Sequence, residues 1–124
     1  MLQALPPTTA QQALEAAIKD YENGSVKTLE SMLPARFIGR DSLLDAARRA
    51  ANDQRQPRVT LSDVQVQGAA GGSPQALSFK WEKRFLRAST GAAVVERGSM
   101  QVVLSQSGAA WQFDNLPTDN LFTR

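Results

Sequence analysis

The chain has 124 residues, a formal net charge of +2, no cysteine and no histidine. Its length suits one domain with a single core, and its hydrophobic fraction of 42% is typical of globular proteins. The missing cysteine and histidine exclude disulfides, thiolate catalysis and most zinc sites. We expect no metal, no cofactor, no nucleic-acid binding and no membrane insertion of this segment, because the basic excess is small and no apolar stretch is long enough.

The first half of the chain predicts helices, because its apolar residues recur with a period of 3.6. Thr9 and Asp41 are the expected caps of the first and third helices, since their side chains can accept a backbone N–H. Pro34 is expected to stop the second helix, and residues 35–38 then form a brief strand or an extended crossing. The predicted helices cover residues 10–23, 26–33 and 42–52.

After Pro57 the apolar period changes from 3.6 to 2, which predicts strands. Val59 and Leu61 share one parity and Val64 and Val66 the other, so we expect a β-bulge between Leu61 and Val64. The predicted strands cover residues 58–67, 75–88, 93–106 and 109–116.

Short turns predict two antiparallel hairpins among the last three strands. Pairing of Ala88 with Ala93 in the first hairpin puts the large apolar residues on one face of the sheet, which the helices must then cover. The predicted opposite pairs are Leu77 with Leu104, Phe79 with Val102, Trp81 with Met100, Phe85 with Glu96, Gln106 with Ala109, Trp111 with Leu104, and Phe113 with Val102.

Three segments carry a family resemblance: residues 21–33, with a tyrosine and a glycine at a helix junction; residues 39–44, where a glycine opens a helix; and residues 108–113, where a turn glycine precedes a tryptophan. In this order they resemble the nuclear transport factor 2-like superfamily of cystatin-like α+β cones. The resemblance implies three N-terminal helices packed on a curved four-stranded antiparallel meander, with a pocket at the wide end and frequent dimerisation through the outer sheet face. It implies no single function, because the superfamily includes enzymes and binding domains.

We expect residues 10–117 to form a single domain, residues 1–9 an extended lead-in or linker, and residues 118–124 a C-terminal tail. The proline-stiffened lead-in favours a module of a larger bacterial protein. Its location stays undecided, with a periplasmic domain of a membrane-anchored protein favoured over a cytoplasmic one.

Candidate ligand-binding residues lie on the concave face, toward the first hairpin: Tyr21, Trp81, Lys83, Arg87 and Glu96. In the predicted register Glu96 is diagonal to both Lys83 and Arg87, close enough for an ion pair. Together they could bind a small polar or anionic ligand above Trp81. We favour the competing interpretation, in which Tyr21 is a core residue and water surrounds the charges of an overhanging hairpin tip.

Leu86 and Val95 are predicted to pair on the otherwise polar outer face. With Val103 they form a candidate interface for a protein partner or a second copy, although scattered exposed apolar residues are equally ordinary. A basic stretch could bind a phosphate or an acidic partner, but a solvated face is favoured. It comprises Arg48, Arg49, Arg55 and Arg58.

The leading functional hypothesis is a non-catalytic association or ligand-binding domain, which binds a protein partner or itself and has no catalytic residues. The alternative is a small isomerase or hydrolase-type enzyme with a pocket inside the cone, using Glu96 or a capping aspartate as base and Tyr21 or Lys83 to polarise the substrate. A cone interior filled by aromatic side chains would speak against the enzyme, and a deep cavity with a buried carboxylate would speak for it.

Overall fold

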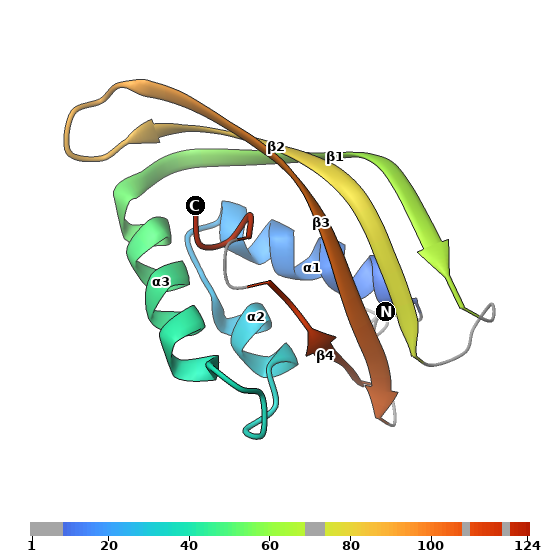
Figure 1. Cartoon of the computed structure of the whole chain (residues 1–124). Coiled ribbons are helices and arrows are strands. Elements are labelled where there is room, and N and C mark those ends of the chain that lie inside the picture. The colour runs from blue at the N-terminus through green and yellow to red at the C-terminus, as the bar shows by residue number, and fades with distance from the viewer. Residues whose placement is uncertain (1–8, 69–73, 108–109, 118–119) are drawn as a thin grey trace, which may run out of the picture.

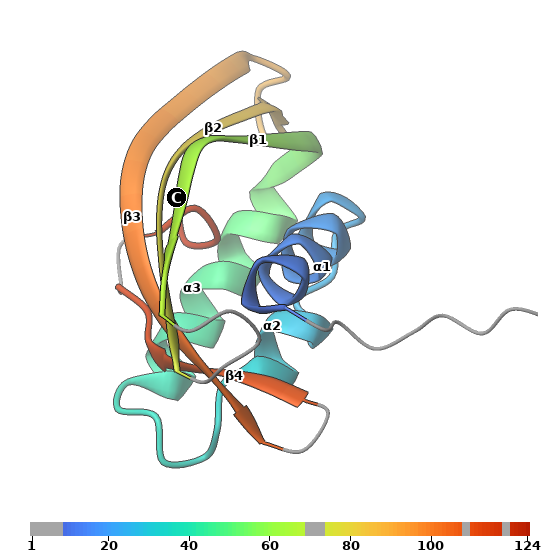
Figure 2. The ribbon, with the colours of Figure 1, turned by 90° about the vertical axis from the view of Figure 1, so that its right-hand side faces the viewer.

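The computed structural model describes residues 9–68, 74–107, 110–117 and 120–124 (Figure 1). Three helices precede a four-stranded antiparallel sheet of order β1-β2-β3-β4, which confirms the predicted α+β class. In a view at right angles to Figure 1, the long strands β1 to β3 curl round the helices, which lie on the concave side of the sheet (Figure 2). The elements are α1 (Ala10–Glu22), α2 (Lys27–Met32), α3 (Arg40–Asp53), β1 (Gln54–Gln67), β2 (Gln75–Arg87), β3 (Ala93–Ser107) and β4 (Ala110–Asn115).

Helix α1 begins where the sequence predicts it, at a reciprocal cap. The N–H of Gln12 donates to Thr9 Oγ1 at 3.1 Å, and the N–H of Thr9 donates to Gln12 Oε1 at 3.3 Å. One apolar stripe of the helix is buried against the sheet. It comprises Ala10, Ala13, Leu14, Ala17, Ile18 and Tyr21.

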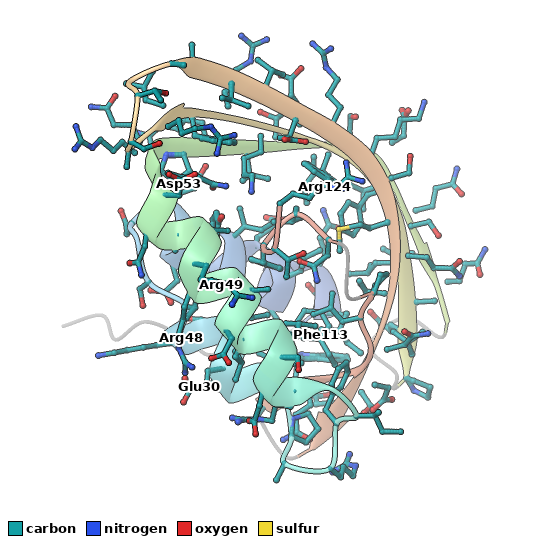
Figure 3. The ribbon with its side chains drawn as sticks, turned by 60° about the vertical axis from the view of Figure 1, so that its left-hand side comes forward. Glu30, Arg48, Arg49, Asp53, Phe113 and Arg124 are labelled. Atoms are coloured by element: carbon teal, nitrogen blue, oxygen red, sulfur yellow. The ribbon has the colours of Figure 1, made fainter. Side chains whose placement is uncertain are left out.

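Helix α3 differs from the prediction at its start. Its cap is Gly39, with φ +80°, a left-handed conformation that glycine adopts at little cost. The prediction of Asp41 as cap is therefore wrong, and Asp41 lies exposed in the first turn. The prediction of a brief strand or an extended crossing at residues 35–38 is also wrong, because turns and a bend occupy that segment. On the solvent side Arg48 contacts Glu30 of α2, with Nη2 and Oε2 2.7 Å apart (Figure 3).

Strand β1 follows α3 directly and so begins four residues earlier than predicted. Its pairing with β2 shifts between Ser62 and Gln65, which confirms the predicted bulge. A second shift, near Gln56, was not predicted. Gln56 and Asp63 both have φ +53°, and each irregularity lets the strand bend round the helices.

Both hairpin registers are displaced by two residues from the predicted ones. Trp81 lies opposite Gly98 and not Met100, and Glu96 lies opposite Lys83. Because side chains alternate with a period of 2, this displacement keeps every residue on its predicted face. The prediction of an apolar concave face is therefore confirmed, whereas the predicted residue pairs between neighbouring strands are wrong. Observed pairs include Leu77 with Val102, Phe79 with Met100, Phe85 with Val94, Leu104 with Phe113, and Gln106 with Trp111.

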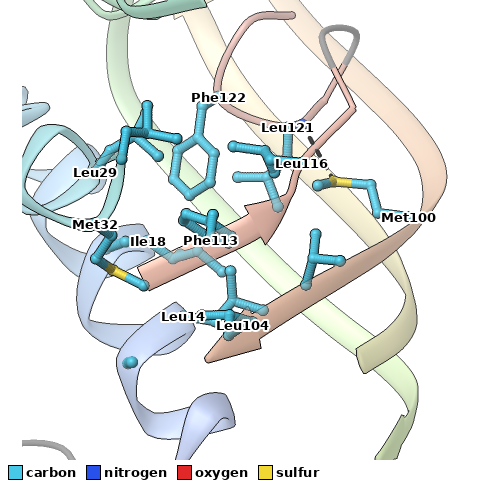
Figure 4. Packing of buried hydrophobic residues seen from close by; sticks show 14 of the residues in the cluster. Leu14, Ile18, Leu29, Met32, Met100, Leu104, Phe113, Leu116, Leu121 and Phe122 are labelled. Atoms are coloured by element: carbon cyan, nitrogen blue, oxygen red, sulfur yellow. Dashed lines mark hydrogen bonds between the residues drawn. The ribbon is translucent and has the colours of Figure 1, made fainter. Parts of the chain in front are cut away.

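The segment of residues 120–124, which we call the C-terminal turn, belongs to the core. The side chains of Leu121 and Phe122 are fully buried among those of α1, α2 and the sheet (Figure 4). Asn120 Oδ1 accepts the N–H of Phe122 at 2.7 Å, which holds the turn in shape. The prediction of a tail outside the domain is thus wrong for these residues, because the chain returns to the concave face and buries its two large apolar side chains there.

Candidate functional site

Lys83 lies at the centre of the candidate site, on the concave face of β2, and is 0% exposed. Its Nζ donates to the main-chain oxygen of Leu121 at 2.8 Å and to that of Arg124. The hydroxyl oxygen of Tyr21 is a third acceptor, 3.3 Å away. The acceptors around this buried amine are therefore two main-chain oxygens of the C-terminal turn and one hydroxyl oxygen.

Tyr21 and Gln54 extend this contact into a closed network. The Tyr21 hydroxyl donates to Gln54 Oε1 at 2.6 Å, and Gln54 Nε2 donates to the main-chain oxygen of Arg124, also at 2.6 Å. The network therefore joins α1, the start of β1, β2 and the C-terminal turn. Each buried polar side chain in it has a partner, as burial requires.

Burial changes the protonation of both titratable groups in the network. It lowers the pKa of Lys83 to about 8, because the charged amine is desolvated, and the carboxylate of Glu96 opposes this only in part. Burial also raises the pKa of the Tyr21 hydroxyl well above its ordinary value, although the hydrogen bond to Gln54 acts in the other direction. The site thus favours a neutral phenol beside an amine that loses its proton more readily than an exposed lysine.

A cleft of about 400 Å³ borders this network, between α3, the strands β2 and β3, and the C-terminal turn. Two ion pairs belong to its lining: Arg87 Nη1 with Asp53 Oδ2 at 2.6 Å, and Arg124 Nη1 with Glu96 Oε2 at 3.9 Å. Its wall also includes Gln54, so the cleft reaches the edge of the buried network. Arg49, Asp53 and Arg124 are labelled around it in Figure 3.

The structure brings together some of the sequence-predicted ligand-binding residues and separates others. Tyr21 and Lys83 are in contact, and Glu96 is the cross-strand neighbour of Lys83. Arg87 pairs with Asp53, away from Glu96, and the buried indole of Trp81 packs against Gly98. Their role in binding a ligand stays a prediction.

The expectation that water surrounds Lys83 is wrong, because the C-terminal turn covers the amine. Sequence reasoning missed Gln54 and this turn as parts of the site. The signal in the sequence was the pair Leu121-Phe122, two large apolar residues in a segment taken for a tail.

The outer face of the sheet carries the candidate interface residues. Leu86 is 37% and Val95 46% exposed, whereas Val103 is half-buried. Leu86 lies opposite Ala93 and Val95 opposite Arg84, so the predicted direct pairing of Leu86 with Val95 is wrong and the two are diagonal neighbours.

Basic side chains surround these apolar residues. Glu82 Oε1 and Oε2 accept from Arg97 Nε at 2.8 Å and from Arg84 Nε at 3.0 Å, and these hydrogen bonds hold the pKa of Glu82 below its usual value. Lys80 pairs with Asp63 across β1 and β2, with Nζ and Oδ2 3.4 Å apart. The register places further basic residues on this face, so cations outnumber carboxylates there. The basic residues are Arg55, Arg58, Lys80, Arg84 and Arg97.

The predicted basic stretch from α3 into β1 is divided among several surfaces. Arg48 pairs with Glu30, Arg49 lines the cleft beside Asp53 and Gln54, and Arg55 and Arg58 face outward from β1. The stretch is therefore not one phosphate-sized cluster.

Within the described ranges, no cluster of three or more potential metal ligands is present. None of the helices in the described part of the chain is long and apolar enough to cross a membrane.

Solved structures share this arrangement of helices inside a curled sheet. A "putative dehydratase from the NTF2-like family" of Streptomyces avermitilis superposes with a TM-score of 0.67 at 15% identity, over 83% of this chain and 88% of that one. The chain has the nuclear transport factor 2-like fold. The beta subunit of benzoate 1,2-dioxygenase from Burkholderia mallei matches the same fold with a TM-score of 0.66 at 14% identity, over 90% of this chain and 88% of its own.

A SEC-C motif-containing protein of Rhodopseudomonas palustris is also similar, with a TM-score of 0.57 at 11% identity, over 87% of this chain and 77% of that one. No family model and no curated protein matches the sequence. At such low identities these likenesses show the nuclear transport factor 2-like fold alone, which does not distinguish binding domains from enzymes.

Proposed function

We propose that this domain is a non-catalytic association module of a larger bacterial protein, and that it binds an acidic partner protein through the outer face of β2 and β3. The observation that carries this proposal is the exposed diagonal pair of Leu86 and Val95 among arginines. An apolar centre with a charged rim is the usual composition of a protein interface.

The charge of the outer face favours an acidic partner over a second copy of the chain. Arg84 and Arg97 share a single carboxylate, that of Glu82, and both arginines are largely exposed. Two copies facing each other through this surface would bring like charges together, which costs free energy at an interface. An acidic surface would instead pair with the same arginines.

The filled interior of the cone also supports a binding role. Phe79, Trp81, Trp111 and Phe113 are at most 4% exposed and belong to one hydrophobic cluster. The C-terminal turn adds Phe122 to the same cluster. A substrate would have to displace these side chains to reach the interior, whereas a partner on the outer face would displace only water.

Site-specific photocrosslinking in the cells that make the protein tests this proposal. A photoreactive amino acid at Val95 should give a covalent adduct with an acidic protein, and Leu86→Glu in the same chain should abolish that adduct. The matched control carries the photoreactive group at Ile38, which is 94% exposed on a distant loop. An equal yield from both positions, or an adduct that survives Leu86→Glu, contradicts the proposed interface.

Sedimentation of the purified chain separates the two kinds of partner. A second copy on this face would give dimers that Leu86→Glu with Val95→Glu converts to monomers. A wild-type monomer that still forms the cellular adduct identifies a different protein as the partner.

One observation favours a second candidate function, a small isomerase or hydrolase-type enzyme. The amine of Lys83 and the hydroxyl of Tyr21 lie 3.3 Å apart in an enclosed site, with Glu96 on the neighbouring strand. Such groups could polarise a carbonyl while Glu96 removes a proton. Turnover lost in Glu96→Gln but kept in Leu86→Glu would favour this candidate over the association module.

A further inference from the structure

Strand β1 lies at an edge of the sheet, because β2 is its one neighbour in the described part of the chain. A groove of about 470 Å³ separates this edge from α1. Its floor is apolar: Ile18 is buried, and Val59, Leu61 and Val64 are half-buried. The residues opposite Val59 and Leu61 on β2 are buried, so the absence of a covering strand leaves the β1 side chains partly in water.

The backbone of β1 directs polar groups into this groove. The N–H of Val59 points away from β2, because Glu22 Oε2 of α1 accepts it at 2.8 Å. Alternate residues of a strand direct their N–H and C=O to the same side, so those of Leu61 also face the groove. Among the residues that the structure describes, no side chain or loop oxygen accepts the N–H of Leu61. Leu61 therefore offers one donor and one acceptor to an added strand.

The α1 wall of the groove adds two charges of opposite sign. Glu15 and Lys19 are exposed, and neither forms an ion pair within the described ranges. They lie four residues apart on a helix, a rise of about 6 Å. Alternate side chains on one face of a strand are about 6.7 Å apart. The two charges thus match the spacing of two alternate side chains of an extended segment.

The direction of α1 fixes the order of the complementary charges. Helix α1 and strand β1 run in opposite directions, and the end of α1 meets Val59 through Glu22 (Figure 1). A segment antiparallel to β1 therefore runs in the direction of α1. It meets Glu15 first and Lys19 second, so a basic residue must precede an acidic one by two positions.

We propose that the groove between α1 and β1 binds an extended segment of a partner protein as an added strand antiparallel to β1, with the pattern apolar-x-basic-x-acidic-x-apolar. The residue opposite Leu61 exchanges two backbone hydrogen bonds with it. The basic and acidic side chains pair with Glu15 and Lys19, and the apolar ones cover the floor of the groove. This site shares no residue with the interface proposed on the outer sheet face.

The free part of the edge is too short for a second copy of β1. Glu22 already accepts the N–H of Val59 on one side of Leu61. On the other side the strand is interrupted by its bulge, where Asp63 has φ +53°. Such interruptions limit pairing between edge strands. A short segment can pair at Leu61 and fill the groove, whereas a second strand of 14 residues could not continue past either interruption.

Titration of the full chain with the peptide Val-Thr-Lys-Thr-Glu-Thr-Val, acetylated and amidated so that its ends are uncharged, tests the proposal. Amide NMR signals locate the binding, and hydrogen exchange reports the backbone bond. At about ten times the dissociation constant, the peptide should slow exchange of the Leu61 amide about tenfold. The amide of Thr60 faces β2 and should keep its rate.

Reversal of the charges tests the side-chain contacts. The peptide Val-Thr-Glu-Thr-Lys-Thr-Val has the same composition and should bind about threefold more weakly or worse, a size suited to exposed ion pairs. Glu15→Lys with Lys19→Glu should invert this preference. The matched control is Asp45→Lys with Arg49→Glu, which makes the same reversal at the same spacing on α3 and should leave the preference unchanged.

Methylation of the peptide backbone tests the added strand itself. N-methyl groups on the lysine and the glutamate remove donors that face β1 and should weaken binding at least about tenfold. N-methyl groups on the second and fourth residues block donors that face solvent, so this matched control should bind like the parent peptide. Leu86→Glu should also bind like the wild type, which keeps the result independent of the outer sheet face.

Four results would overturn the proposal. They are equal binding of the two methylated peptides, a charge preference that survives the double reversal on α1, an unchanged Leu61 amide, and failure of the peptide to bind. A dimer of the chain alone, with the Leu61 amide already protected, would assign the edge to a second copy and overturn it as well.

Discussion

Gly98 of β3 lies directly opposite Trp81 of β2, and its missing side chain makes room for the indole. A Cβ at Gly98 would lie 2.9 Å from three indole atoms, closer than carbon atoms approach in folded proteins. The indole thus occupies the space that a side chain at position 98 would need, and the observed register is the one that puts a glycine there. The predicted register instead put the long side chain of Met100 there.

Gly98→Ala should destabilise the protein by ~1–3 kcal/mol, because the added methyl group displaces a packed indole. Trp81→Phe shortens the ring, so the double variant should cost less than the sum of the two single variants, with a coupling of at least ~0.5 kcal/mol. Urea denaturation measures each value. Ser99→Ala, at the exposed neighbouring position, serves as the control and should stay within ~0.5 kcal/mol of the wild type. If the cost of the double variant equals the sum of the two single costs, the packing of Trp81 does not depend on Gly98.

Phe122→Ala should destabilise the protein by ~3–5 kcal/mol, the usual cost of removing a buried ring. Phe122 is 0% exposed and packs against Tyr21, so its loss opens a cavity at the centre of the fold. Thermal or urea unfolding measures the change. Ile38→Ala, at a side chain 94% exposed, should change stability by no more than ~0.5 kcal/mol. A cost as small for Phe122 as for Ile38 would mean that the C-terminal turn is a detachable tail in solution.

The stability of the wild type relative to Lys83→Met should rise between pH 8 and pH 10. Burial lowers the pKa of Lys83 to about 8 in the folded chain, against 10.5 for an ordinary lysine. The unfolded chain therefore binds more protons in this window, and raising the pH favours the folded chain. The expected relative gain is ~2 kcal/mol, measured by urea denaturation across the window.

Above pH 10 the ionisation of Tyr21 changes the stability of the folded chain in the opposite direction. Burial raises the pKa of its hydroxyl, so the tyrosine of the unfolded chain ionises first and stability falls as the pH rises further. Tyr21→Phe should remove this fall. A wild-type stability that declines relative to Lys83→Met between pH 8 and pH 10 would show that the amine stays charged in the folded chain.

Glu22→Ala should cost ~1–2 kcal/mol, because it leaves a partly buried backbone donor without its acceptor. Glu22 Oε2 accepts the N–H of Val59 at 2.8 Å, which ties the end of α1 to β1. Glu15→Ala changes an exposed glutamate on the same helix and should be nearly neutral. Equal effects of the two substitutions, measured by urea denaturation, would contradict a structural role for the bond to Val59.

Local patterns predicted much of this fold because their causes are local. The cap at Thr9, the helical apolar stripes and the bulge between Leu61 and Val64 each follow from neighbouring residues. The assignment of side chains to the two sheet faces was also correct, since a displacement of two residues leaves parity unchanged. The hairpin partners were not predicted, because the fit of Trp81 against Gly98 depends on a contact between strands.

The candidate site was predicted less well for the same physical reason. Tyr21 and Lys83 could be assigned to the concave face from periodicity alone, but the acceptors of the Lys83 amine come from residues far away in the chain. Periodicity carries no information about which distant main-chain oxygen will reach a buried amine.

By itself the sequence determined the helices, the bulge and the two faces of the sheet, because each depends on the steric and apolar preferences of adjacent residues. Only the tertiary structure decided that Lys83 is buried, and that Lys83 and Gln54 both donate to main-chain oxygens of the C-terminal turn. Those contacts join residues many positions apart, and they form only once the apolar side chains of Leu121 and Phe122 have left water for the core.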